Sequence, residues 1–174
     1  MWQEFLPQIL KRDFKALARS ISLIENEAAG YDKLLRSLPP GITPVIGITG
    51  PPGAGKSTLT DALIGLLVSK QKKVAVLCID PSSPFNMGAV LGDRIRMSKW
   101  YTHANVFIRS IASRKALGGL SPMIIEISSY IKNAGFDFVI IETVGVGQSE
   151  IEIAGLADIT ALILVPESGD EIQT

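Results

Sequence analysis

A glycine-rich run, GPPGAGKS at residues 50–57, constrains the fold of this chain more than any other part of its sequence. The run matches the pattern G-x-x-x-x-G-K-[ST] at every fixed position. An apolar stretch, VIGIT, precedes it, and an amphipathic stretch that starts with KSTLTDAL follows. A strand that turns into a helix through such a loop presents backbone N–H groups at the positive end of the helix dipole. Because such groups hold phosphate oxygens well, the run predicts a phosphate-binding loop.

The residue types of this loop suit that chemistry. Glycines at positions 50, 53 and 55 allow the backbone to turn tightly and to approach phosphate oxygens without interference from a Cβ atom. We expect Lys56, at the loop surface, to lie near the β- and γ-phosphates, Ser57 to bind Mg²⁺, and Thr58 to lie near the α-phosphate. The predicted nucleotide-binding residues of the loop are Gly50, Pro51, Pro52, Gly53, Ala54, Gly55, Lys56, Ser57 and Thr58.

A regular alternation surrounds the loop, because short β-branched runs are each followed by a longer amphipathic segment. Strands are predicted at 45–49, 73–79, 105–109, 138–141 and 159–165, and helices at 56–70, 92–102, 122–133 and 150–156. The strand runs are apolar on both faces, which is typical of a parallel sheet covered by helices on both sides. The pattern predicts an α/β fold with a doubly wound, mainly parallel sheet, as in P-loop NTPases.

The first forty residues are predicted to form a helical extension. Apolar residues recur within 14–24 at spacings of three and four, and Asp13 is placed to cap a helix that begins there. The pair Pro39-Pro40 stops any helix. We therefore predict an N-terminal helical extension over 1–40 and a nucleotide-binding domain over 41–174.

Carboxylates follow two of the predicted strands. Asp80 comes directly after one of them and Glu142 directly after another. Since the carboxyl ends of parallel strands meet at one edge of the sheet, both are expected near the phosphate loop. Together with Ser57 they are predicted to bind Mg²⁺, and Asp93, farther along the segment after Asp80, is a third candidate carboxylate. The alternatives are that Asp80 starts a turn, that Asp93 caps a helix, and that Glu142 is a surface carboxylate.

The run ETVG at residues 142–145 has the form of the D-x-x-G element of GTPase switch II, with glutamate in place of aspartate. Gly145 is expected to turn its N–H toward the γ-phosphate, a contact through which a loop senses hydrolysis. Gln148 is placed to orient a water molecule, and a solvated loop residue is the alternative. The catalytic residues predicted from these patterns are Lys56, Glu142 and Gln148. Arginines that either stabilise transition-state charge or form surface salt bridges are Arg94, Arg96, Arg109 and Arg114.

Composition argues against several classes of partner. The chain has 17 basic and 17 acidic residues, so its net charge gives no electrostatic reason to expect nucleic acid or an acidic membrane as a partner. No signal-peptide pattern opens the sequence, and its apolar runs are too short to span a bilayer. The one cysteine, Cys78, lies in an apolar run and is predicted to be a core residue, which fits a reducing cytoplasm.

Four strings, GITGPPGAGKSTL, VLCIDPSSP, LGDRIRM and IIETVGVGQSE, resemble one family in their order and spacing. It is the MeaB/ArgK-type family of G-protein chaperones of adenosylcobalamin-dependent methylmalonyl-CoA mutase, formerly named LAO/AO transport system kinases. The resemblance implies a SIMIBI-type G domain that binds GTP with Mg²⁺ and hydrolyses GTP slowly. It also implies a chaperone that gates loading and protection of the mutase's cobalamin cofactor, and a homodimer of the full-length protein. By position, Asp80, Asp93 and Glu142 match the family's acidic metal and switch residues, and the resemblance thereby implies a metal-binding and catalytic role for Asp93.

The resemblance also bears on the last residues of the chain. The family's guanine-specificity motif, N-K-x-D, does not occur in these 174 residues, so we expect the chain to be truncated before it. Residues 165–174 resemble the start of an additional switch loop that faces the mutase, and Glu167-Ser168 departs slightly from the family's P-G-x-G-D pattern. Two other functions stay open at this point: a phosphotransferase, as the older kinase name suggests, and a non-catalytic nucleotide-binding module.

Overall fold

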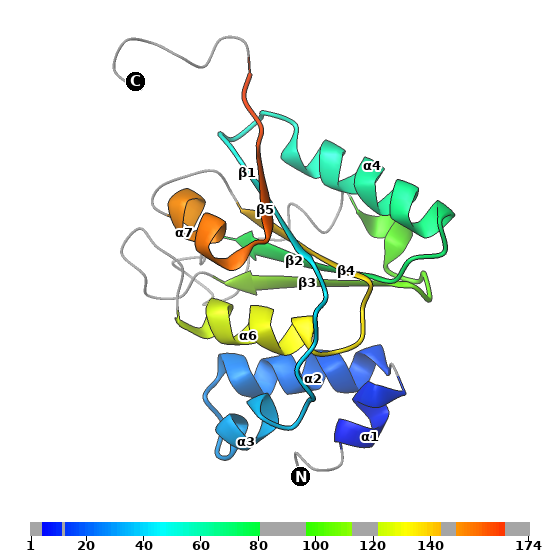
Figure 1. Cartoon of the computed structure of the whole chain (residues 1–174), viewed down its shortest axis with the longest axis vertical. Coiled ribbons are helices and arrows are strands. Elements are labelled where there is room, and N and C mark those ends of the chain that lie inside the picture. Colours follow the sequence, from blue (N-terminus) through cyan, green and yellow to red (C-terminus); the bar gives the residue numbers. More distant parts are fainter. Residues whose placement is uncertain (1–4, 12, 81–96, 113–121, 144–148, 166–174) are drawn as a thin grey trace.

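The computed structural model describes residues 5–11, 13–80, 97–112, 122–143 and 149–165, which form a five-stranded sheet with helices around it (Figure 1). Every strand pair in this sheet is parallel, and the strands lie in the order β3-β2-β4-β1-β5. The α/β fold with a parallel sheet is therefore confirmed. The strands are β1 (Val45–Thr49), β2 (Val74–Asp80), β3 (Val106–Ala112), β4 (Phe138–Thr143) and β5 (Ile159–Leu162).

Helices cover both faces of the sheet, as Figure 1 shows with α4 above it and α6 below it. Val76 of β2 lies in the core under α4, whereas its neighbour Leu77 lies in the core that α6, α7 and α2 cover. Because successive side chains of a strand point to opposite faces, the uninterrupted apolar runs of the sequence fill both cores. Cys78 is 1% exposed in the first of these cores, as expected. The helices are α2 (Phe14–Glu25), α4 (Lys56–Ser69), α6 (Pro122–Lys132) and α7 (Ser149–Leu156).

The bounds of the elements follow the sequence-based expectations with one exception. The predicted strand at 45–49 is found with these bounds, and the other matched elements differ at their ends by at most three residues. The helix predicted at 92–102 is wrong for the residues that the structure describes there, since a turn at Met97 leads into a 3₁₀ helix, η2 (Ser98–Trp100). A period of three places Met97 and Trp100 on one side, and both pack into the core next to α4.

Three short or medium helices precede the sheet. Asp13 caps the second of them as expected, because its Oδ1 accepts hydrogen bonds from the backbone N–H groups of Lys15 at 2.8 Å and Ala16 at 3.2 Å. The apolar stripe of that helix is buried in the same core as β2 and α6. The division of the chain near residue 40 into an extension and a domain stays a prediction. The first and third of these helices are α1 (Phe5–Leu10) and α3 (Tyr31–Leu35).

An ion pair joins β3 to α2. Nη2 of Arg109 donates to Oε2 of Glu25 at 2.6 Å and to Oγ of Ser22 at 2.9 Å. The two charged side chains are largely buried, at 23% and 13% exposure. Because α2 lies on the sheet face opposite α4, Arg109 is a salt-bridging residue in this structure and not a neighbour of the phosphate loop.

One edge of the sheet is more exposed than the rest. β5 pairs with β1 alone among the described strands, and its Ile159 and Leu162 are 69% and 57% exposed. Just beyond this strand, the N–H of Ile163 donates to the carbonyl oxygen of Thr49 at 2.8 Å. The edge thus reaches as far as the end of β1. Within the described ranges, no helix is both long and apolar enough to cross a bilayer.

Replacement of Gly65 by alanine is expected to stabilise the protein. Gly65 lies in the interior of α4, and a Cβ atom there would meet the ring of Trp100 at 3.6 and 3.9 Å, which is ordinary van der Waals contact. Alanine removes the entropic cost of glycine within a helix, so we expect a gain of about 0.5–1 kcal/mol. Urea unfolding followed by circular dichroism measures it. A loss of stability would show that the ring does not keep this place on α4.

Candidate nucleotide-binding site

The loop between β1 and α4 has a backbone that its glycines permit. Gly50, Gly53 and Gly55 have φ angles of 135°, 81° and 95°, which residues with side chains rarely adopt. At Gly50 there is a second reason, because a Cβ atom there would overlap the carbonyl oxygen of Ile163. At Gly53 and Gly55 no described atom lies within 4 Å of such a Cβ atom. Among the described residues, the loop is therefore held on the side of β5 and open at Gly53 and Gly55.

α4 begins directly at this loop. Gly55 is its N-cap in the left-handed conformation, without a side-chain cap, and the carbonyl oxygen of Gly55 accepts the N–H of Leu59 at 2.9 Å. The N-terminus of a helix favours an anion through its first-turn N–H groups and its dipole. In this first turn Lys56 and Ser57 are buried, whereas Thr58 is exposed. The structure thus gathers the predicted loop residues at one helix N-terminus, and their role in binding stays a prediction.

Lys56 is buried, so the expectation that it lies at the surface of the loop is wrong. It is 7% exposed, and its Nζ donates to the carbonyl oxygens of Gly50 at 2.7 Å and Pro51 at 2.9 Å. A buried ammonium group needs such acceptors, because burial without hydrogen bonds is costly. The two bonds fix the positive charge beside the backbone of the loop, where the sequence predicts the phosphates.

A buried carboxylate lies against the first turns of α4. Glu142 is 2% exposed, its Oε1 accepts the hydroxyl of Ser57 at 2.6 Å, and its Oε2 lies 2.7 Å from the hydroxyl of Thr60. The alternation of β4 explains the placement, since Phe138 and Ile140 also lie in the core under α4. Glu142 is therefore not a surface carboxylate, which was the alternative to its predicted role. Its two oxygens are both engaged by the helix that follows the phosphate loop.

Thr60 is a member of the site that the sequence reasoning missed. It is fully buried, and its Oγ1 lies within donor distance of the carboxylate of Glu142 and of the carbonyl oxygen of Lys56 at 3.0 Å. The signal was present, because Thr60 follows Ser57 by three positions and so shares its face of the helix. A second pair lies nearby at the strand ends, where the hydroxyl of Thr143 donates to Oγ1 of Thr49 at 3.0 Å.

The strand ends meet as the sequence predicts. In the register of β2 and β4, Cys78 is opposite Glu142, and Asp80 is the last residue of β2. The backbone of Asp80 therefore reaches the same edge of the sheet as Glu142 and the phosphate loop, which follows β1. The helices after the adjacent strands β1 and β4, namely α4 and α7, lie on opposite faces. Such a switch point is where ligands bind in open α/β sheets.

Several predicted site residues lie outside what the structure describes. These are Asp93, Gly145 and Gln148, the side chain of Asp80, and the candidate arginines Arg94, Arg96 and Arg114. Their predicted roles in metal binding, switching and catalysis stay predictions. Of the carboxylates proposed for the metal, Glu142 is the one whose side chain the structure describes.

The described oxygen atoms suit Mg²⁺ as a ligand set. Mg²⁺ prefers hard oxygen ligands and in nucleotide sites is usually held by one or two carboxylates or hydroxyls together with phosphate oxygens and water. Ser57 and Glu142 supply a hydroxyl and a carboxylate whose oxygens are 2.6 Å apart at the helix N-terminus. Among the described residues there is no group of three or more histidine, cysteine, aspartate or glutamate side chains that could hold a metal ion. The described part of the site therefore fits an ion whose remaining ligands include phosphate oxygens and water.

Comparison with known proteins places this geometry in context. A family model described as methylmalonyl Co-A mutase-associated GTPase MeaB matches residues 17–174. The Escherichia coli protein named GTPase ArgK is 38% identical, over 98% of this chain and 53% of ArgK. The fused isobutyryl-CoA mutase of Geobacillus kaustophilus is also 38% identical, over 97% of this chain and 16% of that protein. A crystal structure of an LAO/AO transport system kinase superposes with a TM-score of 0.73 at 31% identity, over 98% of this chain and 52% of that chain.

These similarities agree on the family, and their coverage limits which properties of the relatives can be assigned to this chain. The chain spans about half the length of ArgK and of the transport system kinase, so the activities and partners of those longer proteins do not pass to it by similarity alone. The family model, in contrast, covers most of the chain, including the phosphate loop and the strand ends that carry the predicted acidic residues. The resemblance read from the four sequence strings is confirmed, and the chain belongs to the MeaB family of methylmalonyl-CoA mutase-associated GTPases.

Proposed function

We propose that this chain supplies the GTP-binding and GTP-hydrolysing site of a chaperone for an adenosylcobalamin-dependent methylmalonyl-CoA mutase. The observation that carries the proposal is the buried hydrogen bond between Ser57 and Glu142, which are 85 positions apart in the sequence. A glycine-rich loop that only turned the chain would need no buried carboxylate at its helix, and burying one is costly. A loop that binds a triphosphate with Mg²⁺ needs that carboxylate beside its hydroxyl.

Each residue of the site has its own role in this proposal. Backbone N–H groups of the loop from 50 to 58 hold the phosphates, and Lys56 places its charge next to them. Ser57 and Glu142, with Asp80 and Asp93 as the predicted further acidic residues, hold Mg²⁺. When bound, Mg²⁺ offsets the charge that develops on the phosphate oxygens during hydrolysis. Predicted partners of the same reaction are Gly145, as a sensor of the γ-phosphate, and Gln148, as the residue that orients water.

The mutase partner is supported by two names. The family model is described by its association with methylmalonyl-CoA mutase, and the Geobacillus kaustophilus relative is named a fused isobutyryl-CoA mutase. A segment similar to this chain therefore occurs within a polypeptide that is itself named a mutase. We propose that this chain, in its full-length protein, gates the loading and protection of the mutase's cobalamin. A cytoplasmic location and a homodimer of the full-length protein belong to the same proposal.

Replacement of Glu142 by glutamine tests the metal part of this proposal. Glutamine keeps the shape of the side chain and its contacts with Ser57 and Thr60, because its amide both accepts and donates hydrogen bonds. It removes the negative charge that Mg²⁺ prefers in a ligand. We expect Mg²⁺ to bind about 10- to 100-fold more weakly, so that more Mg²⁺ is needed for half-maximal activity, and we expect GTP hydrolysis to be slower. Phosphate release in the full-length protein over a Mg²⁺ series measures both.

A matched variant separates charge loss at the site from charge loss in general. Glu27→Gln removes a carboxylate from an exposed residue beyond the end of α2 and should leave the Mg²⁺ series unchanged. If Glu142→Gln hydrolyses GTP with the wild-type Mg²⁺ dependence, Glu142 serves only to hold two hydroxyls, and the observation that carries the proposal is lost.

The chaperone part has its own test. Purified mutase added to the full-length protein is expected to raise the slow intrinsic rate of GTP hydrolysis. No change in the rate would contradict the chaperone role while leaving nucleotide hydrolysis intact. The superposed crystal structure is named a transport system kinase, and this name favours phosphotransfer as a second candidate. Label from γ-³²P nucleotide that appears on a protein or small molecule, in place of free phosphate, would support that candidate.

A further inference from the structure

Two hydroxyl groups of α4 hold the carboxylate of Glu142, one at each of its oxygens. Oγ of Ser57 donates to Oε1 at 2.6 Å, and Oγ1 of Thr60 donates to Oε2 at 2.7 Å. Residues three apart on a helix are neighbours on one face, so a carboxylate between them can accept one hydroxyl with each oxygen. All three side chains are buried. The contact with Thr60 therefore acts directly on a predicted ligand of Mg²⁺.

The hydroxyl of Thr60 has one proton and two acceptors within reach. The carbonyl oxygen of Lys56, four positions earlier in the helix, lies 3.0 Å from Oγ1, and Oε2 of Glu142 lies 2.7 Å from it. Hydrogen bonds from a hydroxyl to an ionised carboxylate are shorter and stronger than those between neutral groups. The shorter contact is the one to the carboxylate, so the proton is directed to Glu142.

Ser128 shows the more usual arrangement of a buried hydroxyl within a helix. Its Oγ donates to the carbonyl oxygen of Ile124, four positions earlier in α6, at 2.6 Å. A hydroxyl that bonds in this way serves the local backbone. At Thr60 the corresponding contact is the longer of the two, at 3.0 Å. Bonding to the local backbone therefore does not account for the position of the Thr60 hydroxyl.

The contact with Thr60 restricts the rotation of the carboxylate. The last torsion of a glutamate side chain has a broad, two-fold distribution, so a carboxylate that is held at one oxygen can still turn about that contact. A hydrogen bond at the other oxygen fixes the plane of the group. Because Oε2 is held at Thr60, Oε1 stays beside Ser57 in the first turn of α4, next to the phosphate loop. Such partners of a metal-ligating carboxylate orient the ligand and raise the affinity for the metal.

We propose that Thr60 is a positioning residue for Mg²⁺, because its hydroxyl fixes the carboxylate of Glu142 with Oε1 toward Ser57. The inference rests on the proposed GTPase function of this site. Mg²⁺ demands near-ideal octahedral geometry, so its binding is sensitive to a carboxylate that turns away from the productive orientation. Thr60 contacts neither the metal nor the nucleotide in this scheme, and it acts through Glu142.

The test replaces Thr60 by valine in the full-length protein, which removes the hydroxyl and nearly keeps the shape of the side chain. We expect the Mg²⁺ concentration for half-maximal GTP hydrolysis to rise about tenfold. At saturating Mg²⁺ the rate should recover to within about twofold, since Glu142 keeps its charge. Affinity for GTP in EDTA should also stay within about twofold, because the N–H groups of the loop are unchanged. Thr60→Ser keeps the hydroxyl and should resemble the wild type in all three measurements.

Three further variants separate positioning of the metal ligand from support of the helix. Ser128→Ala also removes a buried helical hydroxyl, but on the opposite face of the sheet, and should change none of the three measurements. In the Glu142→Gln background, Thr60→Val should shift the Mg²⁺ dependence by less than about twofold, because residues that act through one contact are not additive. Thr60→Cys has a weaker donor, should give an intermediate shift, and provides the same test if the valine variant does not fold.

The outcomes distinguish this inference from the proposed function. Wild-type Mg²⁺ dependence in Thr60→Val would overturn the inference alone and leave the role of Glu142 intact. An equal loss of GTP affinity with Mg²⁺ and with EDTA would also overturn it, since the hydroxyl would then serve the structure of α4 and not the metal. A full additional shift in the Glu142→Gln background would do the same. Absence of GTP hydrolysis in the wild-type protein would overturn the proposed function and this inference with it.

Discussion

Replacement of Gly50 by alanine is expected to abolish GTP binding and to lower the free energy of unfolding by about 3 kcal/mol. Two causes act together. The φ angle of Gly50 is 135°, and a Cβ atom there would overlap the carbonyl oxygen of Ile163. That oxygen cannot move away freely, because the N–H of the same residue is bonded to the carbonyl oxygen of Thr49 at 2.8 Å. The loop must therefore shift, and the ring of N–H groups that it forms is lost.

Titration calorimetry with Mg²⁺ and GTP measures the binding, and urea unfolding measures the stability. The matched control is Gly155→Ala in α7, where φ is not positive and no described atom lies within 4 Å of the added Cβ. This control should bind GTP normally and be at least as stable as the wild type, because alanine favours a helix over glycine. Normal GTP affinity in Gly50→Ala would refute the loop geometry on which the proposed site depends.

Replacement of Lys56 by alanine is expected to weaken GTP binding by about 100-fold or more, since a charge-assisted contact with two phosphates is lost. From the sequence alone, a lysine at the surface of the loop would be removed without any effect on folding. The structure changes that expectation. Nζ of Lys56 bonds to the carbonyl oxygens of Gly50 and Pro51, so its removal should also cost about 1–2 kcal/mol of stability.

Lys70→Ala is the matched control for this variant. Lys70 ends the same helix, is exposed, and carries the same charge, so its removal should leave both affinity and stability close to those of the wild type. Affinity is measured by fluorescence titration with a labelled GTP analogue, and stability by thermal unfolding. Tight binding by Lys56→Ala, with the protein folded, would mean that the lysine serves the loop structure and not the phosphates.

Local patterns predicted the fold and the placement of the site well. The glycine-rich run, the apolar strand before it and the amphipathic helix after it are all local features, and β1 has the predicted bounds. Asp80 and Glu142 were placed at one sheet edge by a rule about parallel strands that needs no knowledge of packing. The observed register, with Cys78 opposite Glu142, agrees with that rule.

What was missed depends on contacts between distant parts of the chain. Thr60 joins the site because it meets Glu142, which lies 82 positions away. The helical period that places Thr60 on the face of Ser57 does not show which distant residue it meets. The inward position of Lys56 depends on the path of the loop backbone, which residue types alone do not define. The segment after Met97 was predicted as a regular α-helix, but its packing on α4, with Trp100 bonded to Asp61, favours a 3₁₀ turn. Tertiary contacts outweighed local helical periodicity there.

Ile163 links the exposed edge of the sheet to the phosphate loop. The residue extends the exposed edge strand β5, yet it bonds to Thr49 and lies against Gly50. We therefore expect this edge and the loop to open together, and a ligand of the loop to suppress that opening. By thermodynamic linkage, a nucleotide present at about 100 times its dissociation constant would make that opening less favourable by about 2.7 kcal/mol. The stability of the edge strand β5 is thus expected to report whether the site is occupied, although the residues of β5 are not predicted to contact the nucleotide.

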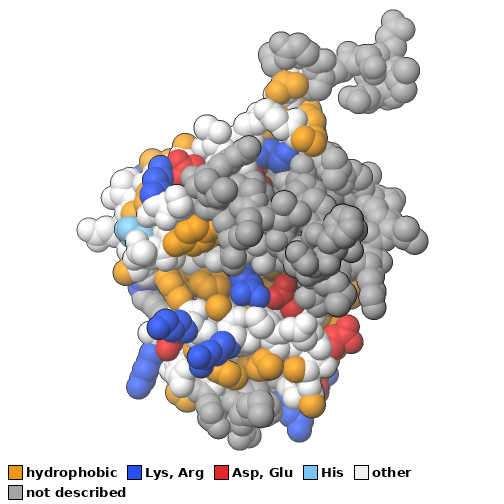
Figure 2. All heavy atoms as spheres, turned by 180° about the vertical axis from the view of Figure 1, so that it is seen from behind, with side chains coloured by type: hydrophobic (Ala, Val, Ile, Leu, Met, Phe, Trp, Pro, Cys, Tyr) orange, Lys and Arg blue, Asp and Glu red, His pale blue; other side chains and the backbone are white. Residues whose placement is uncertain are grey.

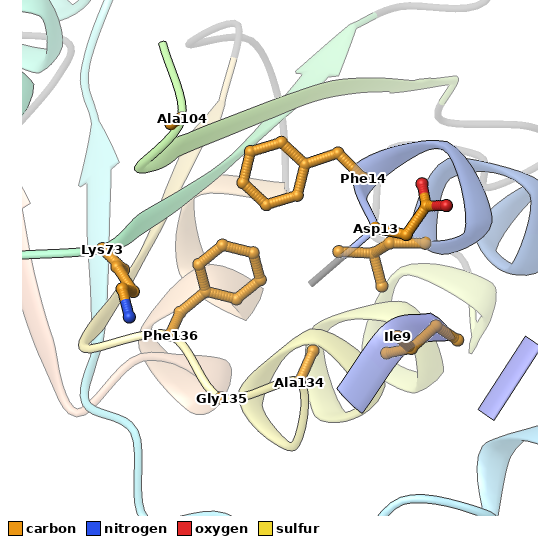
Figure 3. A pocket seen from close by; sticks show the side chains of 9 residues that line it. Ile9, Asp13, Phe14, Lys73, Ala104, Ala134, Gly135 and Phe136 are labelled. Atoms are coloured by element: carbon orange, nitrogen blue, oxygen red, sulfur yellow. The ribbon is translucent and has the colours of Figure 1, made fainter. Parts of the chain in front are cut away.

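A small apolar pocket lies between the N-terminal helices and the sheet, and Ile9, Phe14 and Phe136 line it (Figure 3). Figure 2 shows the face of the molecule opposite to that of Figure 1. Phe14 of α2 stacks on Phe136 at a centroid distance of 6.1 Å, which ties the first helices to the start of β4. β4 carries Glu142 at its other end. The N-terminal helices are therefore expected to stabilise the strand that carries Glu142, the predicted metal ligand.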